Sequence, residues 1–171
     1  MKQAALVVVG GAALMLAACG SETSGEFKTE DGKNAEYTID KETGETSMTI
    51  EGEDGEASLR AGANVPVSLP DGFTLFPGSK VVNNAVVNQP DGQGTMITFE
   101  SDAPAEKVVA HYRDAAKAAG FDIQLEMNTN GTQMVAGERK ADSATVSVTA
   151  TPGEGGSVTT GQIIIATKKG G

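Results

Sequence analysis

Hydrophobic and polar residues follow three different patterns along the chain. Residues 4–16 form an uninterrupted apolar run, residues 26–60 carry short alternating runs in a polar background, and residues 61–171 hold longer alternating runs. Alternation at every second position indicates strands with one buried face, whereas apolar positions three and four residues apart indicate a helix. The pattern therefore predicts an apolar leader followed by a β-rich folded part.

One helix is predicted, over residues 104–119. Pro104 suits the first helical position, no breaker follows it for more than a dozen residues, and Gly120 is a stop signal. Alanine-rich helix faces permit close approach to a sheet. The face that we expect to be buried consists of Val108, Tyr112, Ala115 and Ala119.

Strands surround this helix in the sequence. The Asn130-Gly131 pair is a strong tight-turn signal, because both residues tolerate positive φ. One helix among antiparallel strands predicts an α+β domain over residues 61–171, an antiparallel sheet with the helix packed on one face. Phe121, Ile123, Leu125 and Met127 should share the buried face of one strand. The predicted strands are 81–87, 95–100, 121–128, 132–140, 144–151 and 158–167.

A small acidic β-meander is predicted to precede this domain, over residues 26–60. Hairpin turn signals at Asp31-Gly32, Thr43-Gly44 and Asp54-Gly55 separate short strands at 34–40 and 46–51. Large apolar residues are scarce here, so the segment cannot easily offset its own ordering entropy. It should either pack against the second half of the chain or fluctuate, and we expect a marginally stable meander that packs on its neighbour.

The leader carries the most specific motif. Met1 and Lys2 precede the apolar run, and Leu16-Ala17-Ala18-Cys19 places small residues just before a cysteine. The run is shorter than the roughly 20 apolar residues that a spanning helix needs. This pattern resembles the signal of bacterial lipoproteins.

The lipoprotein resemblance implies a topology. Residues 1–18 would be a cleaved signal peptide, Cys19 would carry acyl chains such as palmitate, and residues 19–25 would be the lipidated cysteine with a flexible tether. The protein would then be exported and anchored to the cell envelope. Gly20 in place of the aspartate that retains lipoproteins at the inner membrane favours the outer membrane.

The helix region also resembles small envelope domains of obscure role. The resemblance rests on Asp102 to Val108, Tyr112 and Gly120-Phe121, where a helix opens after a proline and ends in glycine and an aromatic residue. It brings no catalytic residue with it.

Candidate catalytic chemistry is sparse. The single cysteine, Cys19, is the expected lipidation residue of the leader motif, so neither a disulfide nor a thiolate nucleophile is expected. His111 is the only histidine, and we interpret it as a boundary residue on the flank of the helix without a partner. No Gly-x-Ser-x-Gly or Ser-x-x-Lys motif is present. We therefore expect a protein that is not an enzyme and uses no cofactor.

Acidic turns offer one alternative, a calcium site. The candidate ligands, whose oxygens suit calcium, are Asp40, Glu42, Glu51, Glu53 and Asp54. Glu45 stands where a calcium loop running from Asp40 to Glu51 would need glycine. The pattern favours a solvated acidic hairpin, and we expect no bound metal.

Charge limits the possible partners. The chain has a net charge of −10, and removal of Lys2 with the leader makes it −11. Such a surface repels nucleic acid, and Lys168-Lys169 is too small a basic patch to change that. The sequence favours a non-catalytic envelope lipoprotein that binds another envelope component. A carrier of a small apolar ligand and a calcium- or carboxylate-dependent module stay open as alternatives.

Overall fold

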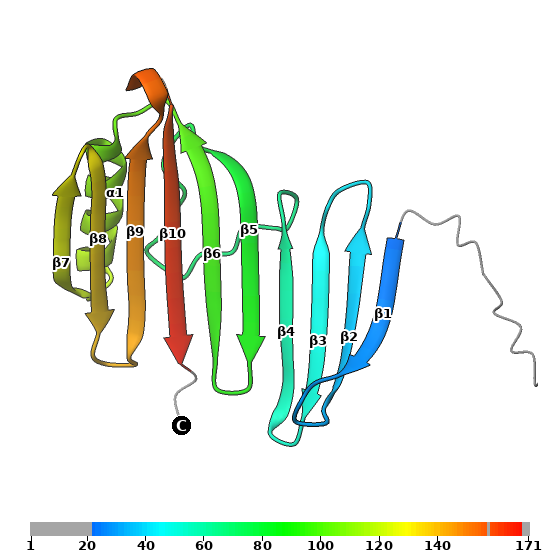
Figure 1. The fold of residues 1–171 in the computed structure, drawn as a ribbon. Coiled ribbons are helices and arrows are strands. Elements are labelled where there is room, and N and C mark those ends of the chain that lie inside the picture. Colours follow the sequence, from blue (N-terminus) through cyan, green and yellow to red (C-terminus); the bar gives the residue numbers. More distant parts are fainter. Residues whose placement is uncertain (1–21, 157, 169–171) are drawn as a thin grey trace, which may run out of the picture.

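The structure, a computed structural model, describes residues 22–156 and 158–168. Within these ranges one antiparallel sheet of ten strands forms the body of the molecule, and helix α1 packs on it (Figure 1). An antiparallel sheet with one helix on a face is the predicted arrangement. The strands are β1 (Glu22–Lys28), β2 (Asn34–Asp40), β3 (Thr46–Gly52), β4 (Gly55–Gly62), β5 (Lys80–Gln89), β6 (Gly92–Ser101), β7 (Asp122–Thr129), β8 (Thr132–Arg139), β9 (Ala144–Pro152) and β10 (Thr159–Lys168).

The strands lie in the order β1-β2-β3-β4-β5-β6-β10-β9-β8-β7. The first six pair with their neighbours in sequence, so the chain advances steadily from one edge to the middle of the sheet. Helix α1 (Ala105–Ala118) then carries the chain to the far edge, and β7 to β10 return until β10 pairs with β6. In the part of the chain that the structure describes, no helix is long and apolar enough to cross a membrane.

Local signals explain the turns. Asn130 and Gly131 have φ values of 51° and 83°, the left-handed pair that a two-residue hairpin between β7 and β8 requires. The predicted glycine turns at Gly32, Gly44 and Gly55 also have positive φ. These turns fix the hairpin positions without help from distant residues.

Helix α1 begins after Pro104 and ends before Gly120, whose φ of 84° cannot continue a helix. The Phe121 N–H donates to the Ala116 carbonyl at 2.9 Å, which turns the chain back over the helix end. Val108 and Tyr112 are buried as predicted. Ala116 is buried as well, whereas the predicted Ala115 and Ala119 are only half-buried, so the buried face is rotated slightly from the expected one.

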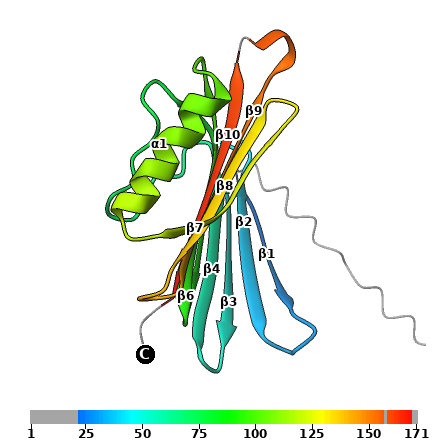
Figure 2. The same ribbon diagram turned by 90° about the vertical axis from the view of Figure 1, so that its left-hand side faces the viewer.

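The hydrophobic core lies between α1 and strands β6, β8, β9 and β10 (Figure 2). Segment 63–79 runs over the same side of the sheet and adds Val65 and Phe73 to the buried residues. The Phe73 and Phe121 rings meet edge to face at 5.8 Å between centroids. The largest side chains that are fully buried include Tyr112, Phe99, Ile97, Ile163, Val108, Val135 and Val148.

The acidic segment is continuous with the rest of the sheet. Strand β4 crosses the predicted boundary at residue 60 and pairs directly with β5, from Ser58 opposite Asn88 to Gly62 opposite Asn84. The tether prediction was wrong for residues 22–25, because β1 pairs with β2 from Glu22 onward. The tether and lipidation predicted for residues 19–21, including Cys19, lie outside the described residues.

Strand β7 differs from its predicted pattern. A bulge between Ile123 and Leu125 shifts the register with β8. Ile123 packs on the core beneath α1, whereas Leu125 and Met127 lie on the opposite face and are exposed. The prediction of one shared face failed because an inserted residue reverses the side to which later side chains point.

Candidate functional site

The two faces of the sheet differ in what covers them. Ile97 and Ile163 point toward α1 and are fully buried, so their neighbours Met96 and Ile164 point to the other side. Figure 2 shows α1 and segment 63–79 on one side of the sheet and no described segment on the other. We call this second side the open face.

One row of directly paired residues crosses the open face over all ten strands. It follows from the register of each neighbouring pair of strands. Only Ser147, Thr46 and Thr23 in this row are polar, and their side chains are small. From the β7 edge to the β1 edge the row consists of Leu125, Ala136, Ser147, Ile164, Met96, Ala85, Ala61, Thr46, Ile39 and Thr23.

Large apolar side chains on the open face are accessible to solvent. Leu125 is 44% exposed, Ile164 39% and Ile39 39%, and Phe27 near the β1 edge is 44% exposed. These side chains point from the same face and are spaced along the row, with smaller residues such as Ala61 and Ser147 between them. Apolar side chains that gather on one face can mark a binding site. The open face can therefore bind an apolar surface.

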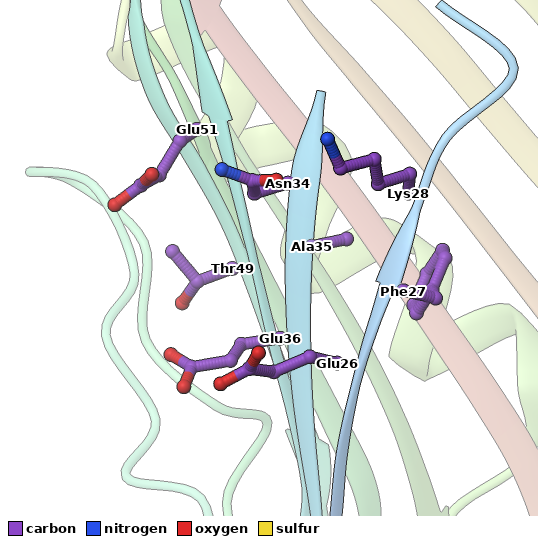
Figure 3. Close-up of a pocket in the computed structure, with 8 residues that line it drawn as sticks. All are labelled: Glu26, Phe27, Lys28, Asn34, Ala35, Glu36, Thr49 and Glu51. Atoms are coloured by element: carbon purple, nitrogen blue, oxygen red, sulfur yellow. The ribbon is translucent and has the colours of Figure 1, made fainter. Parts of the chain in front are cut away.

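The opposite side of β1 to β3 is polar and acidic. The residues on this side that border a groove of about 480 Å³ include one lysine among the acids: Glu26, Lys28, Asn34, Glu36, Thr49 and Glu51. Figure 3 shows the Glu26 and Glu36 side chains directed to one side of the strands and Ala35 to the other. Glu26 and Glu36 are direct cross-strand partners, so two like charges face each other there.

The predicted calcium ligands do not form a site. Asp40 and Glu42 lie before β3, and Glu53 and Asp54 lie after it, so a strand of roughly 20 Å separates the two turns. No group of three His, Cys, Asp or Glu residues within 22–156 and 158–168 is placed to hold a metal ion. Glu51 instead borders the groove on β1 to β3.

Asp40 has a structural role in its turn. Its Oδ1 accepts hydrogen bonds from the backbone N–H groups of Glu42 at 2.8 Å and Thr43 at 2.9 Å. These bonds, the one from Thr43 first, lower the pKa of the Asp40 carboxyl below its ordinary value. The carboxylate stabilises the turn between β2 and β3.

His111 has partners that the sequence did not indicate. Its ring meets Phe76 edge to face at 5.4 Å between centroids, and Nε2 lies 3.4 Å from the Thr74 carbonyl oxygen. The adjacent Tyr112 hydroxyl accepts a hydrogen bond from the Phe76 N–H at 3.0 Å, and burial raises the pKa of Tyr112. Both side chains fasten segment 73–76 to the helix.

Arg139 was also missed by sequence reasoning. Its guanidinium donates to Asp142 at 3.0 and 2.7 Å and to the Ala119 carbonyl at 3.0 Å, and it lies 4.8 Å from the Phe121 ring centroid. The hydrogen bonds from Arg139 lower the pKa of Asp142. Arg139 thus ties the end of α1 to the β8–β9 connection. The spacing of Arg139 and Asp142 was the only available signal.

The space between α1 and the sheet is filled by side chains. Phe99 and Tyr112 are both fully buried there, with ring centroids 5.9 Å apart. A shallower groove of about 300 Å³ lies between α1 and the β7–β8 edge, bordered by Val109, Ala110 and Arg113 on the helix. Arg113 also lies 3.8 Å from Glu126 of β7.

Comparison with protein families gives a match over part of the chain. Residues 81–161 are similar to a family whose model is described as START domain-like. The matched region runs from β5 through α1 to the beginning of β10. No curated protein and no solved structure matches the chain.

Proposed function

We propose that this chain is a non-catalytic, lipid-anchored module of the bacterial envelope that binds another envelope protein through its open face. Lipidation at Cys19 is supported by the Leu16-Ala17-Ala18-Cys19 motif. Acyl chains on Cys19 would hold the protein at a membrane, with the outer membrane favoured by Gly20. The described fold begins at Glu22, so the body of the protein would lie close to that membrane.

The observation that carries the binding role is the apolar row across the open face. Burial of side chains such as Ile39, Ile164 and Leu125 against a partner would remove exposed apolar area from water at about 25 cal/mol per Å². The strands of the acidic meander at residues 26–60 would widen this surface, with Phe27 and Ile39 on the open face and carboxylates on the other.

The experiment is site-specific photocrosslinking in intact cells. A photoreactive residue at Ile164 or Ile39 is expected to give the same discrete adduct, and one at Lys117 on the exposed side of α1 is expected to give none. Ile164→Lys should abolish the adduct formed from position 39 without unfolding the protein, because Ile164 is partly exposed. Equal labelling from all three positions would contradict a role for the open face.

A second candidate function is the transport of a small apolar ligand, which the similarity to a START domain-like family favours. The space beneath α1 is filled, so the groove between α1 and the β7–β8 edge is the candidate binding site. Native mass spectrometry of the purified protein should then detect a bound lipid. Ala110→Trp should displace it, whereas Lys117→Trp, on the same helix but outside the groove, should not. Absence of a non-covalently bound lipid from the protein without substitutions would contradict this function.

A further inference from the structure

The two outer strands of the sheet differ in how well they can accept another strand. Strand β1 pairs with β2 over all seven of its residues without a register shift, and no described strand pairs with its outer side. Strand β7 is interrupted by a bulge and carries Asp122 and Glu126 with no basic residue. Bulges and uncompensated charge are the features that protect sheet edges from pairing, and β1 lacks the bulge.

The sequence of β1 is complementary to itself in the antiparallel direction. If two copies pair about Gly25, Glu22 of each copy lies opposite Lys28 of the other, and Thr23 lies opposite Phe27. Within one copy Glu22 lies opposite Asp40, another acid, and Lys28 lies opposite Asn34. Among the described residues no carboxylate forms an ion pair with Lys28. The second copy would supply the opposite charge to both positions.

Pairing about Gly25 also keeps the two faces of the sheet consistent. The two-fold axis would be normal to the sheet, so the helices of both copies would lie on one side and both open faces on the other. Phe27, which is 44% exposed and only 6.3 Å from the Tyr37 ring centroid, would gain Thr23 of the second copy as a neighbour. A chain of charge −10 is otherwise expected to repel itself, so the Glu22–Lys28 match is specific to this edge.

We propose that β1 is the interface of a symmetric homodimer, in which antiparallel pairing about Gly25 joins two sheets into one. Backbone hydrogen bonds along the seven residues supply the attraction, and two Glu22–Lys28 pairs set the register. This proposal does not depend on what the open face binds or on the lipid at Cys19.

Charge reversal tests the register with the full-length protein in detergent, by sedimentation. The protein without substitutions should dimerise. Glu22→Lys and Lys28→Glu should each weaken dimerisation by about tenfold or more, because each places two pairs of like charges in contact. The double variant, which exchanges the two charges and so restores opposite signs across the interface, should recover the original affinity to within about threefold. Both positions are exposed, so circular dichroism should be unchanged.

Mixing the two single variants gives a sharper outcome. One copy then carries lysine and the other glutamate at both positions, so the heterodimer should form more tightly than the homodimer of either variant. Asp122→Lys, the same charge change on the β7 edge, is the control and should leave dimerisation unaltered. A protein that stays monomeric at about 100 µM, or a dimer that is indifferent to these charges, would overturn the proposal.

Discussion

Gly161 of β10 lies directly opposite Phe99 of β6, and the Phe99 ring occupies the space that a side chain at position 161 would need. The ring is fully buried and packs against Tyr112 of α1. A glycine near the start of β10 thus leaves room for the largest residue of β6 beneath the helix. The pair couples the centre of the sheet to α1.

Gly161→Ala is expected to reduce the free energy of unfolding by about 1–3 kcal/mol, because the new methyl group forces Phe99 out of its position. Urea denaturation measures this difference. Gly94→Ala in the neighbouring strand is the control, since no atom lies within 4 Å of the Cβ it would add. An equal loss of stability in both variants would show that the effect does not come from the contact with the Phe99 ring.

Tyr112→Phe is expected to lower the free energy of unfolding by about 1–2 kcal/mol, because the Phe76 N–H loses the hydroxyl acceptor that lies 3.0 Å away. The raised pKa of Tyr112 adds a pH signature. The folded state keeps the phenolic proton longer than the unfolded state, so stability falls as the pH rises above the ordinary value of 10.0. This fall should be smaller in Tyr112→Phe, whereas Tyr37→Phe should retain it.

Asp142→Asn should remove an acid-dependent contribution to stability. Arg139 lowers the pKa of Asp142 in the folded state, so the contribution is present above the ordinary value of 3.8 and is lost as the pH falls through the lower folded value. Urea denaturation should therefore show the variant less stable than the protein without substitutions at about pH 7, with the difference in stability narrowing as the pH falls below 3.8. Asp91→Asn, in the turn between β5 and β6, is the control, and its difference in stability from the protein without substitutions should not narrow in this way. The same narrowing in Asp91→Asn would indicate a general effect of removing a negative charge.

Calcium at about 1 mM is expected to leave the melting temperature unchanged. The Asp40 carboxylate already accepts two backbone hydrogen bonds, and β3 separates it from Glu53 and Asp54. Thermal denaturation with calcium, with magnesium and with a chelator measures this directly. A rise with calcium alone would revive the carboxylate-dependent alternative.

Cys19→Ser is expected to move the protein from the membrane fraction to the soluble fraction, because two or three acyl chains supply about 0.8 kcal/mol for each buried methylene. Fractionation and intact-mass analysis of cells carrying each form provide the measurement. Ser24→Ala should stay with the membranes. Sedimentation of Cys19→Ser with the membranes would refute a lipid anchor at this residue.

Local signals account for the parts of the fold that sequence predicted well. The turn at Asn130-Gly131 and the helix stop at Gly120 depend on the backbone freedom of the residues themselves. Strands β2 and β3 match their predicted positions closely, because each is bounded by a glycine turn. Element type and position are therefore encoded within a few neighbouring residues.

Contacts between distant residues account for what sequence missed. Residues 22–25 are polar and small, which is typical of a tether, yet they pair with β2. The bulge after Ile123 reversed Leu125 and Met127, because register depends on the partner strand and leaves no trace in the alternation. The candidate calcium ligands, which we did not expect to bind a metal, lie in two turns at opposite ends of β3, a separation that their closeness in sequence does not reveal.

The amino-acid sequence by itself determined most of the described strands, the helix after Pro104, the turns and the leader motif, because each rests on residues that are adjacent in the chain. Only the tertiary structure decided that β10 inserts between β6 and β9, that the ten described strands share one sheet, and that Ile39, Ile164 and Leu125 lie on the same face, which no described helix covers. These features depend on pairing between residues far apart in the chain, where burial of the whole core selects among many local alternatives.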